Sequence, residues 1–295
     1  MLPVRPVARG TRMGRQRDDG DRTAPGLPEP GLASPLDAAL AGREAATPAM
    51  VDRAIAEGRV TLAYQPVVQA NAPDRVAFHE ALLRIVEPDG RTISAGRFID
   101  GVEARATGRQ LDTIALSTGL AALRKHPGLR LAVNMSARSI GFPAWTAALE
   151  RGLQADPTAG ERLILEITER SALVMPDVVA SFMARLQARG VTFALDDFGA
   201  GVTSLRHLRD FCFDIVKIDG GFVKGVDRDP DNHVLCAAIV SIARHFDMFT
   251  VAERVETAAE AATLAAMGVD CLQGYHFAIP TTRPDWMEEP ARRRA

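Results

Sequence analysis

Short apolar runs typical of β-strands recur along the chain from about residue 50, and each run ends in a polar residue. Segments with apolar positions on one helical face follow most of the runs. Burying a polar group at the end of a strand costs free energy unless other polar groups pair with it. We therefore expect the residues at these ends to meet in one site. They are Glu80, Asn134, Glu166, Asp196, Asp197, Lys217, Glu253 and Gln273.

The order of strands and helices predicts an α/β fold in which eight strands close into a barrel. In such a barrel the C-terminal ends of parallel strands converge on one mouth. The first two strands follow each other closely enough to form a hairpin, which permits one antiparallel strand. The alternative is an open doubly wound sheet, which would need ligand groups only near its switch point. The strand candidates are 60–68, 75–84, 129–136, 162–169, 191–201, 213–223, 249–256 and 270–277.

Helices are expected between these strands, and glycines mark two of their ends. Gly190 and Gly268 follow apolar helical patterns, a position where glycine often ends a helix. His79 is expected to face away from Glu80 and to pack, because successive side chains of a strand alternate. Trp145 and Trp286 are too far from the strand ends to suggest base stacking. The expected helices cover 50–58, about 96–125, 143–154, 177–190, 203–210, 231–246 and 257–268.

Composition narrows the class of protein further. The net charge of −2 by itself implies no nucleic-acid groove. The three cysteines form no CxxC pair, which favours a reducing cytoplasm. No apolar stretch is long enough to span a bilayer. Residues 1–45 are rich in Arg, Pro, Gly and Asp and are expected to form a disordered leader. The barrel domain is expected over 50–285, with a C-terminal tail over 286–295.

The residues at the strand ends are mostly oxygen donors, the ligands that Mg²⁺ and Mn²⁺ prefer. The adjacent Asp196 and Asp197 are suited to serve two metal ions, which together stabilise an in-line phosphoryl displacement. One such acid taken alone is as often a helix cap as a ligand, and Asp197 and Glu169 do precede helical segments. The whole set favours a metal site over capping.

Seven motifs lie at these strand ends in a fixed order: EALLR at 80–84, NMS at 134–136, EITE at 166–169, DDFGAG at 196–201, KID at 217–219, AERVE at 252–256 and QGY at 273–275. In order and spacing they resemble the EAL-domain cyclic di-GMP phosphodiesterases of bacteria, over about residues 50–285. The resemblance implies a modified TIM-type (β/α)8 barrel with an antiparallel first strand. It also implies hydrolysis of cyclic di-GMP to linear pGpG with Mg²⁺ or Mn²⁺ in a two-metal site. We further expect a homodimer, no nucleic-acid polymer as partner and no membrane insertion.

The resemblance also assigns roles to single residues. Glu80, Asn134, Glu166 and Asp196 would hold the first metal, with Glu80 counted among the catalytic residues, and Asp196 and Asp197 would hold the second. Lys217 and Glu253 would position and deprotonate the attacking water. Arg84, Gln65 and Gln273 would contact or support the substrate. Glu169 and Glu256 would anchor the loop Phe198–Leu205 at the mouth.

Three positions depart from the usual pattern of the family. Arg254 stands where glycine is common, and its side chain is expected to crowd the mouth, to contact phosphate, or to be solvated. Val202 and the segment ISAGRFID at 93–100 also differ. The rival functions are a catalytically inactive sensor of cyclic di-GMP and a protein-interaction scaffold. Because every expected ligand is present, the sequence favours the enzyme.

Overall fold

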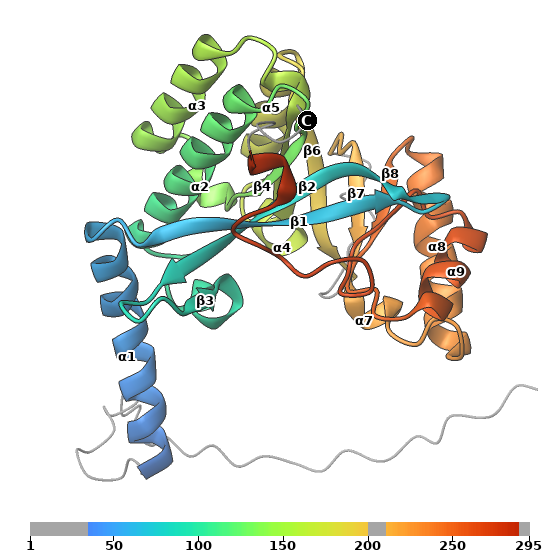
Figure 1. Cartoon of the computed structure of the whole chain (residues 1–295), viewed down its shortest axis with the longest axis horizontal. Helices are drawn as coiled ribbons and strands as arrows, with labels where there is room; N and C mark the ends of the chain where they lie inside the picture. The colour runs from blue at the N-terminus through green and yellow to red at the C-terminus, as the bar shows by residue number, and fades with distance from the viewer. Residues whose placement is uncertain (1–34, 200–210, 289–295) are drawn as a thin grey trace, which may run out of the picture. The chain divides into compact units, whose positions relative to one another are not determined.

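The structure of the chain, a computed structural model, describes residues 35–199 and 211–288 (Figure 1). Two compact units divide the chain, 1–42 and 43–295, and the fold described below lies in the second. Most of the predicted leader and tail, Val202 and the helix expected over 203–210 lie outside the described residues. Helix α1 (Pro35–Ala56) begins well before residue 50, where the apolar pattern places its start.

Eight strands of the described chain close into a barrel, which confirms the expected fold and excludes the open sheet. Strand β1 closes the barrel because it pairs with both β2 and β9, and it runs antiparallel to each. The remaining barrel strands pair in parallel from β2 through β4 to β9. The strands are β1 (Val60–Gln69), β2 (Ala72–Val86), β4 (Leu131–Asn134), β5 (Leu163–Thr168), β6 (Thr192–Phe198), β7 (Ile215–Ile218), β8 (Phe249–Ala252) and β9 (Cys271–Leu272).

Helices cover the outside of the barrel. Apart from the early start of α1, the bounds differ from the apolar pattern in two places: Gly220–Val223, expected at the end of a strand, forms a short helix, and one helix begins late. The helix expected from about residue 96 begins only at Ala106. The short strand β3 (Thr92–Ser94) pairs with β2, and two 3-10 turns follow it, in a segment whose glycines disfavour a helix. The described helices after α1 are α2 (Ala106–Lys125), α3 (Pro143–Ala155), α4 (Glu169–Ala172), α5 (Pro176–Gln187), α7 (Gly220–Val223), α8 (Pro230–His245) and α9 (Ala258–Met267), with 3-10 turns at Ala95–Arg97, Ile99–Gly101, Ala137–Ser139, Gly160–Arg162 and Asp285–Met287.

The main hydrophobic core lies between these helices and the outer face of the barrel. Helix α5 shows how the sequence produces it. Val179, Phe182, Met183 and Leu186 recur at spacings of three and four, so they share one face, and all four are buried. Trp145 of α3 is buried in the same core and lies against Phe182, with ring centroids 5.7 Å apart.

A second, smaller apolar cluster fills the inside of the barrel. Each barrel strand contributes to it, so the lower part of the interior is a packed layer and not a channel. Its members are buried because they alternate along their strands with residues that face the helices. The layer consists of Val67, Phe78, Ala132, Ile164, Ala194, Ile215 and Val251, with Ala77 and Cys271 packed against it.

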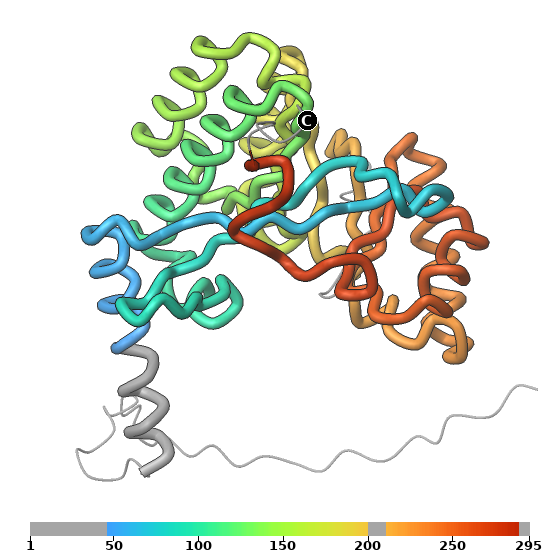
Figure 2. Tube along the Cα trace, viewed as in Figure 1, coloured from blue at the N-terminus to red at the C-terminus, as the bar shows by residue number. Residues whose placement is uncertain are grey.

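The segment after β9 returns across the outer side of β1, so that residues far apart in the sequence lie side by side (Figure 2). Tyr64 pairs with Thr281 as an isolated bridge. Trp286 packs edge-on against Tyr64, at 4.9 Å between ring centroids, and against His79, at 5.7 Å. His79 therefore packs on the side of its strand away from Glu80, as expected.

Candidate active site

The polar residues of the strand ends form a layer directly above the apolar layer. Glu80, Glu166 and Asp196 each lie two positions after an apolar member of that layer on the same strand. Two positions along a strand return to the same face, so both layers point into the barrel. On β1, which runs the other way, the polar residue comes first: Gln65 precedes Val67. The structure thus brings together Gln65, Glu80, Asn134, Glu166, Asp196, Lys217, Glu253 and Gln273.

Lys217 is the centre of this layer. Its side chain is only 1% exposed, and four carboxylates surround its ammonium group. The distances from Lys217 Nζ are 2.7 Å to Glu253 Oε1, 2.9 Å to Asp196 Oδ1, 3.1 Å to Glu166 Oε2 and 3.4 Å to Glu80 Oε2. One positive charge faces four acidic groups, three from other strands and one, Glu253, directly after β8.

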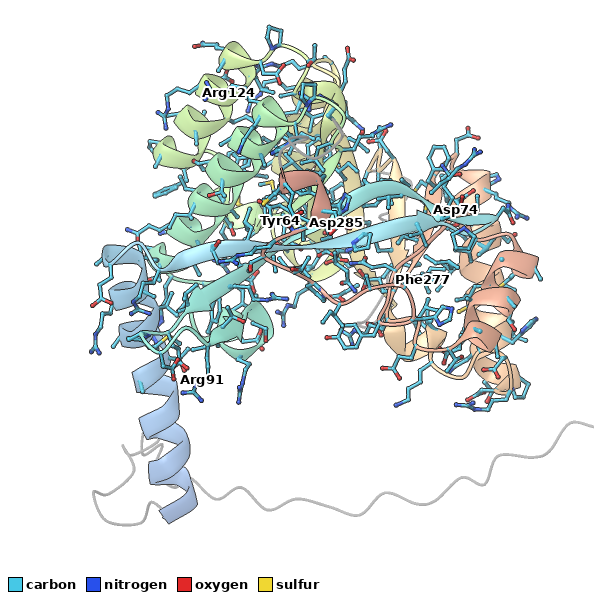
Figure 3. All side chains as sticks on the ribbon, viewed as in Figure 1. Tyr64, Asp74, Arg91, Arg124, Phe277 and Asp285 are labelled. Atoms are coloured by element: carbon cyan, nitrogen blue, oxygen red, sulfur yellow. The ribbon has the colours of Figure 1, made fainter. Side chains whose placement is uncertain are left out.

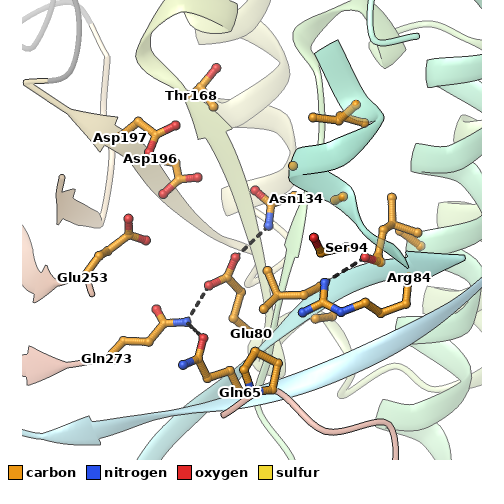
Figure 4. A pocket seen from close by; sticks show the side chains of 18 of the residues that line it. Gln65, Glu80, Arg84, Ser94, Asn134, Thr168, Asp196, Asp197, Glu253 and Gln273 are labelled. Atoms are coloured by element: carbon orange, nitrogen blue, oxygen red, sulfur yellow. Dashed lines mark hydrogen bonds between the residues drawn. The ribbon is translucent and has the colours of Figure 1, made fainter. Parts of the chain in front are cut away.

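Two amide side chains hold the Glu80 carboxylate in place (Figure 4). Asn134 Nδ2 donates to Glu80 Oε1 at 2.8 Å, and Gln273 Nε2 donates to Glu80 Oε2 at 2.7 Å. The same Gln273 nitrogen lies 3.0 Å from Gln65 Oε1, and Gln65 Nε2 donates to the Ala278 carbonyl oxygen. Both oxygens of Glu80 are therefore fixed by neighbours from other strands.

Asp196 and Asp197 lie next to each other in sequence, and regular β-structure would send them to opposite faces. The backbone prevents this, because Asp197 has a φ of 53° and the pairing of β6 with β7 shifts between Leu195 and Phe198. Both aspartates line the same pocket as a result. One oxygen from each of Asp196, Asp197 and Glu253 lies within 4.8 Å of the others.

The crowding of carboxylates changes their pKa values in different directions. Burial favours the neutral form of Glu80, but Lys217 and the two amide donors outweigh it, so the pKa of Glu80 lies below its usual value. Burial and the nearby charge of Glu80 raise the pKa of Glu166 well above its usual value. Burial likewise raises the pKa of Glu253 to about 8, although Lys217 opposes this. The carboxylates keep Lys217 protonated in spite of its burial, because they raise its pKa.

This electrostatic imbalance fits a divalent cation. Four carboxylates against one ammonium leave excess negative charge in a buried place, which bound protons or bound cations must offset. Glu166 Oε1 is buried and has no hydrogen-bond partner among the described residues, so a carboxylate oxygen is left over for a ligand. All the donors are oxygens, which suits a hard divalent ion. The acidic cluster can therefore bind a metal.

A pocket of about 610 Å³ opens directly above this cluster. Gln65, Arg84, Asp197 and Glu253 line it. Six residues that follow β2 in the chain also line it: Ser94, Ala95, Gly96, Ile99, Asp100 and Glu103. The guanidinium of Arg84 donates to the Leu83 carbonyl oxygen at 2.8 Å and faces the pocket from β2. The expected substrate-contacting residues thus share one cavity with all the expected metal ligands except Glu166, which is buried and does not line it.

The two expected loop anchors are placed only in part. Glu169 begins α4 and Glu256 is exposed at the rim of the pocket. Most of the loop Phe198–Leu205 lies outside the described residues, so the anchoring role stays a prediction. At its start, Gly199 has a φ of 99°, and a Cβ there would collide with the ring of Phe222. Only glycine fits this position.

Sequence reasoning missed a structural acid beside the site, Glu260. Its carboxylate accepts backbone N–H bonds from Gly225 at 2.8 Å, Glu256 at 2.9 Å and Thr257 at 3.0 Å, while Thr257 caps α9 in return. Glu260 thereby ties the segment after Glu253 to the turn after α7. The signal was present, because Thr257-x-x-Glu260 is the pattern of a capping box.

Replacing Glu260 by alanine is expected to lower the free energy of unfolding by about 2–3 kcal/mol, because buried N–H groups lose their acceptor. Thr257→Ala removes one half of the box and should cost only about 1 kcal/mol. Those N–H bonds outweigh burial and lower the pKa of Glu260, so its contribution is present above the unfolded pKa and is lost as the pH falls. Urea unfolding at pH 7 and pH 4 measures both effects. A Glu260→Ala loss no larger than that of the exposed control Glu161→Ala would contradict this assignment.

Asp112 of α2 is a second residue that the sequence did not single out. It is buried and accepts hydrogen bonds from Ser139 Oγ at 2.5 Å and from the backbone N–H of Ser136 at 3.0 Å. Burial raises the pKa of Asp112 to about 6. These bonds hold the turn that follows Asn134, so Asp112 positions a residue of the site. No local pattern in the sequence could have shown this, because α2 and the turn meet only in the fold.

Comparison with known proteins agrees with this geometry. The family model of the EAL domain matches residues 49–280. A relative from Escherichia coli K12, described as the probable cyclic di-GMP phosphodiesterase PdeN, is 31% identical over 80% of this chain and 47% of its own length. The cyclic di-GMP phosphodiesterase NbdA of Pseudomonas aeruginosa is 31% identical over 77% of this chain and 30% of its own. The chain spans about half or less of these two relatives.

Solved structures show the same fold. PaMucR phosphodiesterase, in a c-di-GMP complex, is 30% identical, with a TM-score of 0.69 over 76% of this chain and 97% of that chain. An EAL domain protein from Listeria monocytogenes EGD-e is 26% identical, with a TM-score of 0.70 over 79% and 92%. The chain belongs to the EAL domain family. No helix in the described ranges is long and apolar enough to cross a membrane.

Proposed function

We propose that this chain hydrolyses one phosphodiester bond of cyclic di-GMP and releases linear pGpG, using Mg²⁺ or Mn²⁺. The observation that carries the proposal is the arrangement of four carboxylates around Lys217 at the floor of a pocket that Arg84 lines. Relatives described as cyclic di-GMP phosphodiesterases support the choice of substrate.

The residues of the polar layer divide into two groups in this proposal. Glu80, Asn134, Glu166 and Asp196 would hold one divalent ion, and Asp196 and Asp197 would hold a second. When bound, the two ions supply charge stabilisation for an in-line displacement at phosphorus. The hydrogen bonds from Asn134 and Gln273 keep Glu80 oriented before any ligand enters. The site is thus organised in advance, which lowers the cost of reaching the transition state.

Glu253 and Lys217 act on the attacking water. The pKa of Glu253, raised to about 8 by burial, makes its carboxylate a strong enough base to accept a proton near neutral pH. Lys217 opposes this rise and favours the ionised form of Glu253, which is the form that accepts the proton. Lys217 Nζ, 2.7 Å from Glu253, orients this carboxylate and remains positively charged throughout. Arg84 binds a substrate phosphate, and Gln65 and Gln273 contact the bound nucleotide.

The direct test incubates the purified chain with cyclic di-GMP and Mn²⁺ and separates the products by chromatography. We expect pGpG, abolition of turnover by chelation, and recovery with Mg²⁺ or Mn²⁺. Ca²⁺ is expected to inhibit, because its longer and looser coordination does not suit the two-metal geometry. Rapid turnover in chelator would refute the metal mechanism. Binding without pGpG, whichever divalent ion is added, would favour the sensor instead.

Metal binding is also expected to alter the pH dependence of stability. Burial raises the pKa of Glu253 from 4.5 to about 8, so the folded metal-free protein binds more protons than the unfolded chain between these values. The melting temperature in chelator should therefore fall as the pH rises from about 5 to 8. Added Mn²⁺ should raise it more at pH 8 than at pH 6, because the cation offsets charge that protons offset at lower pH. A Mn²⁺ shift equal at both pH values would count against this site.

Three finer expectations stay predictions alongside this proposal. Sedimentation velocity of the purified chain checks the homodimer. Deleting residues 1–45 tests whether the barrel needs its leader. Folding and turnover are expected to be nearly unchanged. The cytoplasmic location is proposed from the three free cysteines, Cys212, Cys236 and Cys271.

A further inference from the structure

Arg254 stands at the mouth of the pocket. It follows β8 and Glu253 directly, its side chain is exposed, and it lines the same cavity as Arg84 and Asp197. Its positive charge is close enough to act on the Asp197 carboxyl group. The guanidinium therefore belongs to the pocket and not to the outer surface of the barrel.

The backbone of Arg254 has a φ of 54°, in the left-handed region that residues with a Cβ seldom adopt. Glycine takes this conformation freely, and asparagine takes it more easily than arginine does. A strained residue of this kind at the edge of a site is a reason to look for a function in its side chain.

The side chain of Arg254 lies across the backbone of Gly220, the first residue of α7. A Cβ on Gly220 would be 2.7 Å from Arg254 Cβ and 2.8 Å from Arg254 Cγ, and would also collide with Cδ. Gly220 therefore leaves the space that the arginine occupies. This contact orients the side chain through its carbon atoms and leaves the hydrogen-bond donors of the guanidinium unused.

The donors of Arg254 are available to a ligand. Three arginines line the pocket among the described residues, and two of them already have partners. Arg170 pairs with Glu103 at 3.7 Å, and Arg84 donates to the Leu83 carbonyl oxygen. Arg254 makes no hydrogen bond or ion pair with any residue in the described ranges. A free guanidinium fork is well suited to a phosphate.

We propose that Arg254 is a substrate-binding residue that contacts a phosphate of the cyclic dinucleotide on the β8 side of the mouth, while Arg84 serves the β2 side. This inference rests on the proposed function. Arg84 and Glu253, the residue before Arg254, lie on opposite sides of the carboxylate cluster (Figure 4). A cyclic dinucleotide carries two phosphodiester groups, so it presents an anion to each side.

The test compares wild type, Arg254→Asn and Arg254→Lys at saturating Mn²⁺. Asparagine tolerates the left-handed backbone and removes the charge, so KM should rise about 10-fold while kcat stays within about twofold. Lysine keeps the charge, so the KM of Arg254→Lys should lie between those of wild type and Arg254→Asn. Calorimetry with cyclic di-GMP in Ca²⁺ should show a matching rise in Kd. The KM difference should also shrink at high salt, because the contact is exposed.

Two controls make the result specific. Arg130→Asn makes the same change of charge at an exposed residue just before β4, at the other end of the barrel, and should leave KM unchanged. The Mn²⁺ concentration for half-maximal rate separates an effect on phosphate from an effect on the metal ligands. Melting temperatures establish that each variant is folded.

The outcomes separate this inference from the function on which it rests. If wild type neither binds cyclic di-GMP nor yields pGpG, the proposed function fails. If wild type is active and Arg254→Asn has an unchanged KM, only the role of Arg254 is overturned. A lower KM would show that the arginine crowds the mouth, and a change confined to the Mn²⁺ requirement would show that it acts on the metal site. Either result also overturns the inference.

Discussion

Replacing Glu253 by glutamine is expected to abolish most turnover while leaving the affinity for cyclic di-GMP nearly unchanged. Glutamine keeps the size of the side chain and one oxygen toward Lys217, which lies 2.7 Å from Glu253 Oε1. It cannot accept the proton of the attacking water. Proton transfer by a positioned base typically contributes ~10²–10⁴-fold, so kcat should fall by that factor. Stopped assays of pGpG and calorimetric binding in Ca²⁺ measure the two quantities separately.

The matched control for this variant is Glu161→Gln, at an exposed residue just before β5, at the other end of the barrel. It makes the same chemical change and should keep full activity. If Glu253→Gln retains a normal kcat, another group accepts the proton. If wild type and Glu253→Gln bind equally well and neither yields pGpG, the chain is a sensor. Arg254→Gly would then be the first variant to examine for restored cleavage.

The second large effect is expected at Asp196. Asparagine has nearly the same shape, but it removes the charge that lies 2.9 Å from Lys217 and is shared between the two proposed metal positions. We expect a loss of at least ~100-fold in kcat, because bound metals supply several kcal/mol of transition-state stabilisation. The Mn²⁺ concentration needed for half-maximal rate should rise as well. Both values come from one titration of activity against Mn²⁺.

Asp74→Asn is the control for this change, since Asp74 is exposed near the turn between β1 and β2 (Figure 3). Near-normal activity of Asp196→Asn would mean that the site has been placed wrongly. A fall in kcat without any change in the Mn²⁺ requirement would mean that Asp196 acts on the substrate and not through a metal.

Most of the polar layer could be predicted from the sequence because its signal is local. Asn134, Glu166 and Lys217 each end a run of buried β-type residues, and a strand has a period of two. Once the strands are parallel, their C-terminal ends must meet at one mouth. The strand-end residues therefore followed from the pattern, whereas Gln65 and Arg84 were expected only from the family resemblance.

Other features had no local signal. Asp196 and Asp197 reach the same pocket because Asp197 takes a left-handed conformation, which the sequence DD does not reveal. Asp112 meets the turn after Asn134 only because α2 packs against β4. The late start of the helix expected from residue 96 is a different case, because the glycines before Ala106 were a local signal against a helix there.

The sequence by itself determined the kinds of element, their order, and the residues at the end of each strand, because these depend on neighbours a few positions apart. Only the tertiary structure decided how those residues meet. Closure of the barrel through β1 places Gln65 beside Gln273, 208 positions apart in the chain. It also places the ammonium group of Lys217 among four carboxylates. The absence of a side chain at Gly220 leaves room for the side chain of Arg254. These arrangements depend on register between distant strands, which is set by packing of the whole barrel and not by any single segment.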